Sequence, residues 1–279
     1  MPARLTIRPM LPPDVAPATE TVLNGGWGDR SAFFAWAIDH PACRPFVADE
    51  GGRIVGTGVA TSYGRVGWVG TIFVAPDRRG GGLGKRLTGA VIDNLRARGC
   101  RTLVLIATEL GRPVYERFGF ELLAAHQRFS TLGSAETEPP PGVRPFAADD
   151  LPAVTALDRV ATGEDRSAVL AALATPESAR VATRPDGSVG GFVVRGPWGG
   201  AALIAPDPVD ALALLEWRRQ RAGPETLVAA GLPGSNEAGR MRLLAAGWSE
   251  APGAVRMIRG EPLDWRPSSI WGQFNGALG

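Results

Sequence analysis

The feature that most restricts the fold of this chain is an internal repeat. A pattern of five residues recurs 136 positions later with identical or similar residue types: Ile7, Arg8, Pro9, Met10 and Asp14 correspond to Val143, Arg144, Pro145, Phe146 and Asp150. Three further segments recur in the same order with slightly shifted spacing: Gly52–Gly56 with Gly187–Gly191, Val74–Asp77 with Ile204–Asp207, and Phe118–Glu121 with Ala246–Ser249. Small shifts of this kind are expected when loops of a duplicated unit change length. The sequence therefore predicts two copies of one α/β unit.

The stretch between the two copies has the composition of a linker. Residues 131–142 contain Gly, Ser, Thr, Glu and three successive prolines, and they offer few apolar side chains for burial. A chain of 279 residues is also long enough for two domains of ordinary size. We therefore predict a first domain over 1–130, a linker over 131–142 and a second domain over 143–279.

Apolar periodicity predicts the secondary structure of the first copy. Strands are expected over 5–10, 45–48, 53–62, 66–74, 101–106 and 120–129, the last closing the first domain. Helices are expected over 12–23, 31–39 with Ser31 as N-cap, 83–98 and 113–118. The short strands around Gly-rich turns favour an antiparallel meander. The predicted fold class is thus α/β, with a mostly antiparallel, twisted mixed sheet flanked by helices in each copy.

Composition excludes several classes of partner. Basic residues exceed acidic ones by only two and are scattered, so no nucleic-acid partner is expected. Two cysteines and two histidines are too few for a disulfide framework or a metal site built from these ligands. Neither a leader peptide nor a run of 18 or more apolar residues is present, so we expect no membrane partner and a cytoplasmic location.

The segment Val74–Leu87 carries the clearest functional signal. It combines a strand end, a basic glycine-rich loop and a helix start. Glycines let the backbone approach a ligand closely, and N–H groups at a helix N-terminus attract anions. Arg79 and Lys85 add full positive charges. The segment therefore predicts a site for phosphate groups.

Two better-known phosphate loops do not fit this segment. A P-loop ending at Gly84-Lys85 requires Gly at position 79 and Ser or Thr at position 86, and both positions are Arg. The dinucleotide pattern counted from Gly80 requires a third glycine where Lys85 stands. The remaining pattern is Arg-x-x-Gly-x-Gly at Arg79, Gly82 and Gly84, which leaves an ATP-binding function disfavoured.

This pattern resembles the coenzyme A pyrophosphate loop of the GNAT superfamily of acyl-CoA-dependent N-acyltransferases. A second element, Val114–Phe120 with Tyr115 and Gly119-Phe120, resembles the superfamily's later Tyr-x-x-x-Gly-Phe signature. The resemblance covers nearly all of residues 1–130. The later half is similar to the degenerate second domain of two-domain members.

The resemblance implies which residues bind the acyl-CoA. The backbone of Ile72, Phe73 and Val74 would pair with the pantetheine arm, on a strand that splays from its neighbour. The pyrophosphate would lie on the loop formed by Arg79, Gly80, Gly81, Gly82, Leu83, Gly84 and Lys85. Acetyl-CoA is the expected donor, because acetyl is the commonest acyl group in the superfamily, and no metal is expected.

Acyl transfer from a thioester to an amine requires an oxyanion donor and a proton for the leaving thiolate. The resemblance assigns the proton to Tyr115, whereas half-buried packing is the competing interpretation of that residue. With a phenol pKa near 10 and a thiol pKa of about 8.5, donation is expected to cost at most a few kcal/mol. The backbone N–H of Phe73 or Val74 would stabilise the oxyanion.

The proton acceptor for the amine is less apparent. Many relatives place a Glu on the fourth strand, but residues 66–74 contain no carboxylate. Glu109 is the nearest candidate, Glu164 and Asp165 are more distant ones, and a solvated carboxylate is an equally good interpretation of Glu109. The apolar C-terminal segment from Ile270 to Leu278 is expected to dock, either against the second domain or with its carboxylate near the site.

The second copy lacks a counterpart of Tyr115 and of the glycine-rich loop. Aligning Gly247 with Gly119 places Leu243 at the position of Tyr115, and Ala205–Asp210 has neither glycine nor cation. Trp27 and Trp36 lie where the superfamily borders its acceptor site, although we favour core packing for both.

The predicted function is N-acylation of a small-molecule or peptide amine by direct attack on acyl-CoA. The alternative is a non-catalytic, coenzyme A-binding regulatory protein; the acceptor and the oligomeric state stay open.

Overall fold

The computed structural model describes residues 5–135 and 138–279, and it divides the chain into two compact units. The first unit runs to Glu121 and also includes Met257–Glu261 and Gly276–Leu278. The second unit comprises Leu122–Arg256, Pro262–Asn275 and Gly279. Residues 1–4 of the predicted first domain and 136–137 of the predicted linker lie outside the described residues, and the boundaries predicted from sequence stay predictions.

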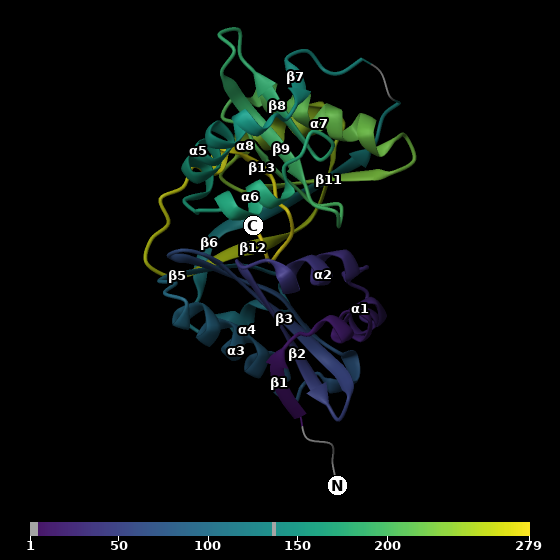
Figure 1. Cartoon of the computed structure of the whole chain (residues 1–279), viewed down its shortest axis with the longest axis vertical. Helices are drawn as coiled ribbons and strands as arrows, with labels where there is room; N and C mark the ends of the chain where they lie inside the picture. The colour runs from purple at the N-terminus through teal and green to yellow at the C-terminus, as the bar shows by residue number, and fades with distance from the viewer. Residues whose placement is uncertain (1–4, 136–137) are drawn as a thin grey trace. The chain divides into compact units, whose positions relative to one another are not determined.

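The first unit is a twisted sheet with helices on both faces (Figure 1). Its elements are β1 (Leu5–Pro9), η1 (Pro12–Asp14), α1 (Val15–Asn24), α2 (Ser31–Asp39), β2 (Cys43–Glu50), β3 (Arg53–Tyr63), β4 (Val66–Val74), η2 (Pro76–Arg78), α3 (Leu83–Ala97), β5 (Thr102–Ala107) and α4 (Arg112–Glu116). Strands β1 to β4 form the predicted antiparallel meander, and β5 is parallel to β4. Residues Met257–Gly260, the end of β12 that belongs to this unit, follow β5 in the strand order.

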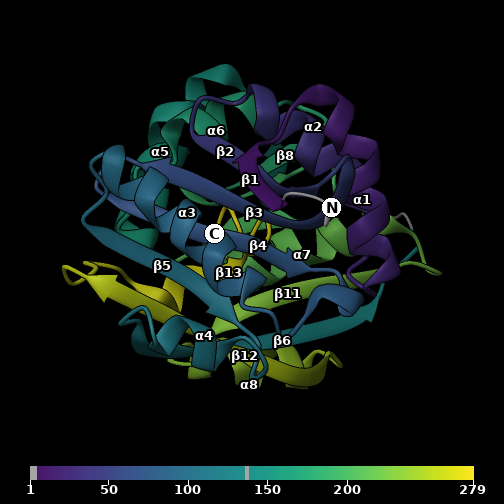
Figure 2. The same ribbon diagram turned by 90° about the horizontal axis from the view of Figure 1, so that it is seen from below.

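Helix α3 covers one face of this sheet (Figure 2). Glycines on β3 and β4 allow the close approach, because a Cβ at Gly58 would lie 3.1 Å from Val91 and one at Gly67 would lie 3.0 Å from Leu95. Leu87, Val91 and Leu95 recur at helical spacing and are fully buried. The core on this face therefore fixes α3, and with it the loop that precedes the helix.

The second unit repeats the same order of elements. These are β7 (Val143–Pro145), η3 (Ala148–Asp150), α5 (Leu151–Thr162), α6 (Ser167–Leu173), β8 (Ala179–Thr183), β9 (Val189–Arg195), β10 (Ala201–Ile204), α7 (Pro208–Ala222), β11 (Leu227–Pro233), α8 (Glu237–Ala245) and β12 (Ser249–Gly260), followed by η4 (Pro267–Ser269) and β13 (Ile270–Gly272). One sheet has the order β13-β10-β9-β8-β7, and β6 (Glu121–Leu132) lies between β12 and β11.

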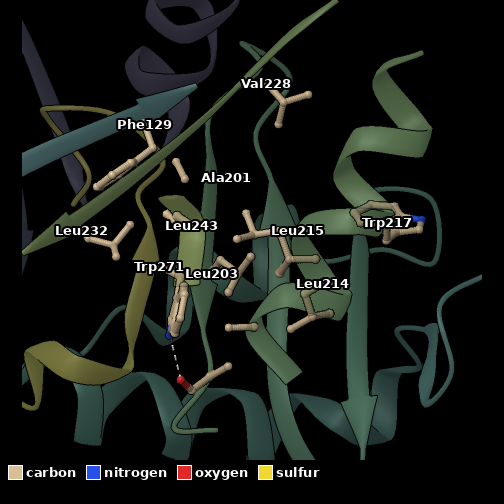
Figure 3. Close-up of a cluster of buried hydrophobic side chains, with 14 of the residues drawn as sticks. Phe129, Ala201, Leu203, Leu214, Leu215, Trp217, Val228, Leu232, Leu243 and Trp271 are labelled. Carbon is tan, nitrogen blue, oxygen red and sulfur yellow. Dashed lines mark hydrogen bonds between the residues drawn. The ribbon is translucent and has the colours of Figure 1, made fainter. Parts of the chain in front are cut away.

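The core of the second unit forms between its strands and α7 (Figure 3). Leu203 from β10, Leu214 and Leu215 from α7 and Trp271 from β13 are almost fully buried there. The Trp271 indole N–H is not left unpaired, because it donates a 3.0 Å hydrogen bond to the Ala205 carbonyl. This core holds no residue of the glycine-rich loop.

Matching ion pairs demonstrate the predicted repeat at the level of side chains. In the first copy Arg8 binds Asp14 at 2.6 Å, and in the second copy Arg144 binds Asp150 at 2.7 Å. Each aspartate also accepts a hydrogen bond from the backbone N–H three residues earlier, at 2.7 and 2.8 Å. The same short sequence thus closes the same turn before α1 and before α5.

Some local predictions need correction. Ser31 is the first residue of α2 and not its N-cap; the N-cap position is Arg30, and the Asp29 carboxylate accepts the Ser31 N–H at 2.7 Å. The strand predicted over 120–129 exists as β6, but from Leu122 onward it belongs to the second unit and pairs with β11. The C-terminal segment docks as expected, with Ala277 and Leu278 fully buried.

Candidate active site

The site begins with an irregularity in β4. Thr57 pairs with Phe73 and Val59 with Gly70, so β4 has two residues where β3 has one. Thr71 in this bulge has a φ of 50°, which makes it the one non-glycine residue with a positive φ in the described part of the chain. The Thr57 hydroxyl donates to the Thr71 carbonyl at 3.0 Å and stabilises the bulge. A threonine in this conformation is strained, and such strain is concentrated at functional sites.

The strand also separates from its neighbour just before the bulge. β4 and β5 pair from Val66–Thr102 to Trp68–Val104, although β4 continues to Val74 and β5 to Ala107. Beyond Trp68 the edge of β4 that faces β5 therefore has no strand partner in the described structure. This is the splay that the sequence resemblance implied, and it leaves the β5 side of Ile72, Phe73 and Val74 without a strand partner in the described residues.

The glycine-rich loop between β4 and α3 is open. A Cβ added at Gly80, Gly81 or Gly82 would meet nothing within 4 Å, and no side chain caps the N-terminus of α3. Gly80 and Gly82 have φ values of 82° and 78°, which L side chains rarely adopt. The helix start is therefore free of a capping side chain, and an anion bound there would be stabilised by the first N–H groups of α3.

The cations of the loop are available to a ligand. Arg79 is exposed and its Nε donates to the Val74 carbonyl at 3.1 Å, which ties the side chain to the end of β4. Lys85 is exposed on the first turn of α3 and has no hydrogen-bond or ion-pair partner in the described residues. Arg78, in contrast, binds Glu50 at 2.7 Å and stabilises the base of the loop.

Phe73 connects the loop to the α1–α2 connection. Its ring is 2% exposed, with the Arg79 guanidinium 5.8 Å from its centroid and the Trp27 ring edge-on at 5.3 Å. Trp27 itself is 40% exposed, so the core packing that we favoured from sequence is wrong for this residue. Trp36 is half-buried and stacks on His40 at 4.4 Å. Sequence reasoning missed the Trp27–Phe73 contact because no motif links residues so far apart in the chain.

Tyr115 lies on the short helix α4 and is 9% exposed. Its ring meets Phe120 edge-on at 6.1 Å, and a Cβ at Gly111 would lie 3.3 Å from it. Its hydroxyl has no hydrogen-bond partner within the described residues. Burial raises the pKa of Tyr115 to about 12, so the value near 10 expected from sequence is too low. The phenol is firmly protonated at neutral pH.

The candidates for a proton acceptor differ in their surroundings. Glu109 is exposed in the turn that follows β5. Asp165 accepts hydrogen bonds from Ser167 and pairs with Arg159, and these contacts hold the pKa of that carboxyl below its usual range. Glu164 is 2% exposed and pairs with Arg256 at 2.9 Å. Of the three, Glu109 has the environment in which a carboxylate can most readily exchange protons with solvent.

The C-terminal segment Gly276–Leu278 packs on the first unit beside the splay. A Cβ at Gly70, two residues past the last β4–β5 pair, would overlap the Cα of Ala277. The Tyr63 hydroxyl donates to the Leu278 carbonyl at 2.8 Å. Gly70 and Tyr63 lie on the sheet face opposite the one covered by α3, because they pair with Val59 and Val66 in the alternation of β3 and β4. The apolar composition of this segment predicted that it docks, but it did not identify Gly70 and Tyr63 as the partners.

In the second copy, the helix that corresponds to α3 is α7, and its N-terminus differs from that of α3. Helix α7 begins directly after the Ala205–Asp207 turn, and the Asp207 side chain caps it by accepting the Val209 N–H at 2.8 Å. A carboxylate therefore occupies the helix start where α3 has Gly82. Leu243, which aligns with Tyr115, is fully buried. The second copy thus offers neither a free helix N-terminus nor a phenol at these positions.

The family comparison agrees with this geometry. Residues 16–120 match the model of the acetyltransferase (GNAT) family, a range that contains β4, the glycine-rich loop and Tyr115. This segment of the chain is therefore similar to the GNAT family. The glycine-rich loop and the Tyr115 element both lie inside the matched segment.

Solved structures with a similar fold extend over nearly the whole chain. A Pyrococcus horikoshii protein superimposes with a TM-score of 0.83 at 21% identity, covering 99% of this chain and 96% of that one. A tandem GNAT protein from the clavulanic acid biosynthesis pathway gives 0.62 at 15% identity, covering 93% and 99%. These likenesses confirm the predicted fold class of two GNAT-like copies.

One curated relative is similar over part of this chain. It is the glucosamine 6-phosphate N-acetyltransferase of Trypanosoma brucei brucei, 38% identical over 84 residues. The match covers 28% of this chain and 55% of that enzyme. The chain therefore spans about half the length of this relative.

Residues 5–135 and 138–279 contain no group of three or more His, Cys, Asp or Glu side chains arranged to hold a metal ion. In the same part of the chain, no helix combines the length and apolarity needed to cross a membrane. Both cysteines, Cys43 and Cys100, are free and buried.

Proposed function

We propose that this protein is an N-acetyltransferase that transfers the acetyl group of acetyl-CoA to the amine of a small molecule or peptide. The observation that carries the proposal is the open, uncapped start of α3 directly after the splayed and bulged β4. The pyrophosphate would bind the N–H groups of residues 80–85 together with Arg79 and Lys85. The pantetheine arm would hydrogen-bond to the free edge of β4 at Ile72, Phe73 and Val74.

In this proposal the acceptor amine attacks the thioester carbon directly. The N–H of Phe73 or Val74 stabilises the oxyanion, and Tyr115 gives its proton to the sulfur as the C–S bond breaks. With a phenol pKa of about 12, full transfer to a thiolate of pKa about 8.5 is uphill by about 5 kcal/mol. This cost is larger than expected from sequence, but it is well below the barrier of about 16 kcal/mol for a turnover of about 10 per second.

Glu109 is our candidate for the acceptor of the amine's proton, directly or through water. It is the candidate carboxylate nearest in sequence to the Tyr115 helix, and it is exposed to solvent. Its replacement by Gln should move the pH–rate profile to higher pH, because the free amine would then have to form in solution. An unchanged profile would exclude Glu109.

The second copy serves in this proposal as a partner without its own cofactor site. The Asp207 cap supports this role, because a carboxylate at the start of α7 repels pyrophosphate. A cytoplasmic location is part of the same proposal, since free, buried thiols and the use of acetyl-CoA both fit a reducing compartment.

Release of free thiol from acetyl-CoA tests the activity. The assay uses the full chain with a panel of amines that includes glucosamine 6-phosphate, aminoglycosides, polyamines and peptide N-termini. Amine-dependent thiol release that is lost in the Gly82→Val variant is the expected result. Binding of acetyl-CoA without turnover on any amine would favour the alternative of a coenzyme A-binding regulatory protein.

A further inference from the structure

Four arginines of the second unit gather on one face of its five-stranded sheet. Arg180 lies in β8 and Arg195 ends β9, while Arg218 and Arg221 belong to α7. Arg180 pairs with Val193, and strand alternation places Arg195 on the same face as Val193. Val193 belongs to the same buried cluster as Leu214 and Trp217 of α7. The strand arginines and the helix arginines therefore face the same space beside Trp217.

Arg218 is the central member of this cluster. It is 8% exposed, and its Nη1 donates to the Ala229 carbonyl at 2.8 Å. A guanidinium has five N–H donors, and this is its only hydrogen bond within the described residues. No carboxylate there pairs with it. Burial of a charge without a counter-ion is strongly unfavourable, so a counter-ion from outside the chain would stabilise this arrangement.

The neighbouring arginines do not relieve this charge. Arg180 lies over the Trp217 ring, with its guanidinium carbon 4.6 Å from the centroid. Arg195 is half-buried and Arg221 is exposed, and neither forms an ion pair within residues 138–279. Desolvation lowers the pKa of Arg218 to about 10, and the charge of Arg195 lowers it as well. The positive charges of the cluster repel one another.

The nearest acids are already engaged elsewhere. Glu216 pairs with Arg219 at 2.9 Å and accepts the Ser134 hydroxyl at 2.7 Å. Glu177 accepts the Thr175 hydroxyl at 2.8 Å. Its charge does not offset the burial and the charge of Arg221, which together lower the pKa of Arg180. The chain therefore surrounds Arg218 with cations and directs its carboxylates to other partners.

We propose that Arg195, Arg218 and Arg221 bind a phosphoryl group or a similar small oxyanion, at a site that belongs to the second unit. The planar guanidinium matches the oxygen spacing of a phosphoryl group and bonds it bidentately, so several arginines together select such an anion. The Ala229 carbonyl and the Trp217 ring hold the cluster in place. The ligand is either free phosphate or the phosphate of a small metabolite, and the test separates the two.

Thermal unfolding of the full chain in increasing inorganic phosphate measures this binding. Coenzyme A is added first at saturation, so that the glycine-rich loop is already occupied, and chloride at equal ionic strength is the reference. The midpoint should rise with phosphate by linkage, and the shift gives a dissociation constant. A phosphate monoester run in parallel separates the sources, because tighter binding of the ester identifies a phosphorylated small molecule.

Two variants make the assignment specific. Arg218→Met and Arg195→Gln should each weaken phosphate binding by about tenfold or more, the loss expected for a charge-assisted hydrogen bond. Arg242→Gln is the matched control, because this exposed arginine of α8 has no partner in the described residues and should leave binding unchanged. If Arg218→Met does not fold, the phosphate affinity of Arg195→Gln alone tests whether the arginine cluster is the binding site.

The contrary results are equally defined. No phosphate-specific rise in wild type, or equal rises in wild type and Arg195→Gln, would overturn the proposal. If coenzyme A itself does not bind, the proposed function fails, and the phosphate titration is then read in the Gly82→Val variant, where the loop cannot contribute.

Discussion

The Tyr63 hydroxyl donates a buried hydrogen bond, 2.8 Å long, to the carbonyl of Leu278. The two residues are 215 positions apart, and the bond attaches the C-terminal segment to the sheet of the first unit. Replacing Tyr63 by Phe removes this buried hydrogen bond, which should destabilise the protein by about 0.5 to 1.5 kcal/mol. Thermal unfolding measures the loss.

The chain supplies a matched control for this experiment in its other tyrosine. The Tyr115 hydroxyl has no hydrogen-bond partner in the described structure, so Tyr115→Phe should leave the unfolding midpoint nearly unchanged. Equal midpoints for the Tyr63→Phe variant and wild type would show that the C-terminal contact contributes nothing to stability.

Gly70 provides a second test of the same contact. A Cβ at this position would overlap the backbone of Ala277, so Gly70→Ala must displace the C-terminal segment or deform β4, at a cost of about 1 to 3 kcal/mol. Gly276→Ala adds the same methyl group on the other side of the contact, where a Cβ meets nothing within 4 Å. The control should change the midpoint little; similar losses in both variants would contradict the packing described here.

The sequence predicted the regular elements well because their signals are local. The apolar spacing of Leu87, Val91 and Leu95 marks one face of a helix, and the Arg8–Asp14 pattern marks a turn that recurs at Arg144–Asp150. The loop with Gly80 and Gly82 could also be predicted from the sequence, because glycine is favoured wherever φ is positive.

What the sequence did not reveal depends on long-range pairing. β6 pairs with β11 about a hundred residues later, and Gly276–Leu278 packs beside Gly70. A threonine at φ 50° contradicts the propensity of its residue type, so Thr71 could only be found in the fold. The raised pKa of Tyr115 likewise follows from burial that no motif encodes.

His126 makes the stability of the protein dependent on pH. Burial, followed by the charges of Arg256 and Arg128, lowers its pKa from 6.5 to about 4. Between pH 6.5 and pH 4, His126 is therefore protonated in the unfolded chain and neutral in the folded chain. The free energy of unfolding should fall by up to about 3 kcal/mol as the pH drops from about 6.5 to 4. Urea unfolding across this range should show a shallower decline in His126→Gln. An identical decline in both proteins would assign the acid sensitivity to other groups.

Tyr115→Phe tests the role of the phenol in turnover. Removing a general acid typically lowers kcat by about 10² to 10⁴. The Kd for acetyl-CoA should change little, since the loop and β4 carry the binding. Because the pKa of Tyr115 is raised to about 12, the wild-type rate should not decline with an apparent pKa near 10. Full turnover in the variant would show that this tyrosine only packs.

Calorimetric titration of acetyl-CoA tests the central claim most directly, because it counts the sites and locates them. Wild type should bind one equivalent, and Gly82→Val should abolish binding, since a β-branched residue does not tolerate the φ of 78° that aims the N–H groups at the pyrophosphate. Gly52→Val is the matched control and should retain binding, because it adds the same side chain at a φ of 94° in the turn between β2 and β3, outside the loop. Two equivalents in wild type, or unchanged affinity in folded Gly82→Val, would contradict a single acyl-CoA site on this loop.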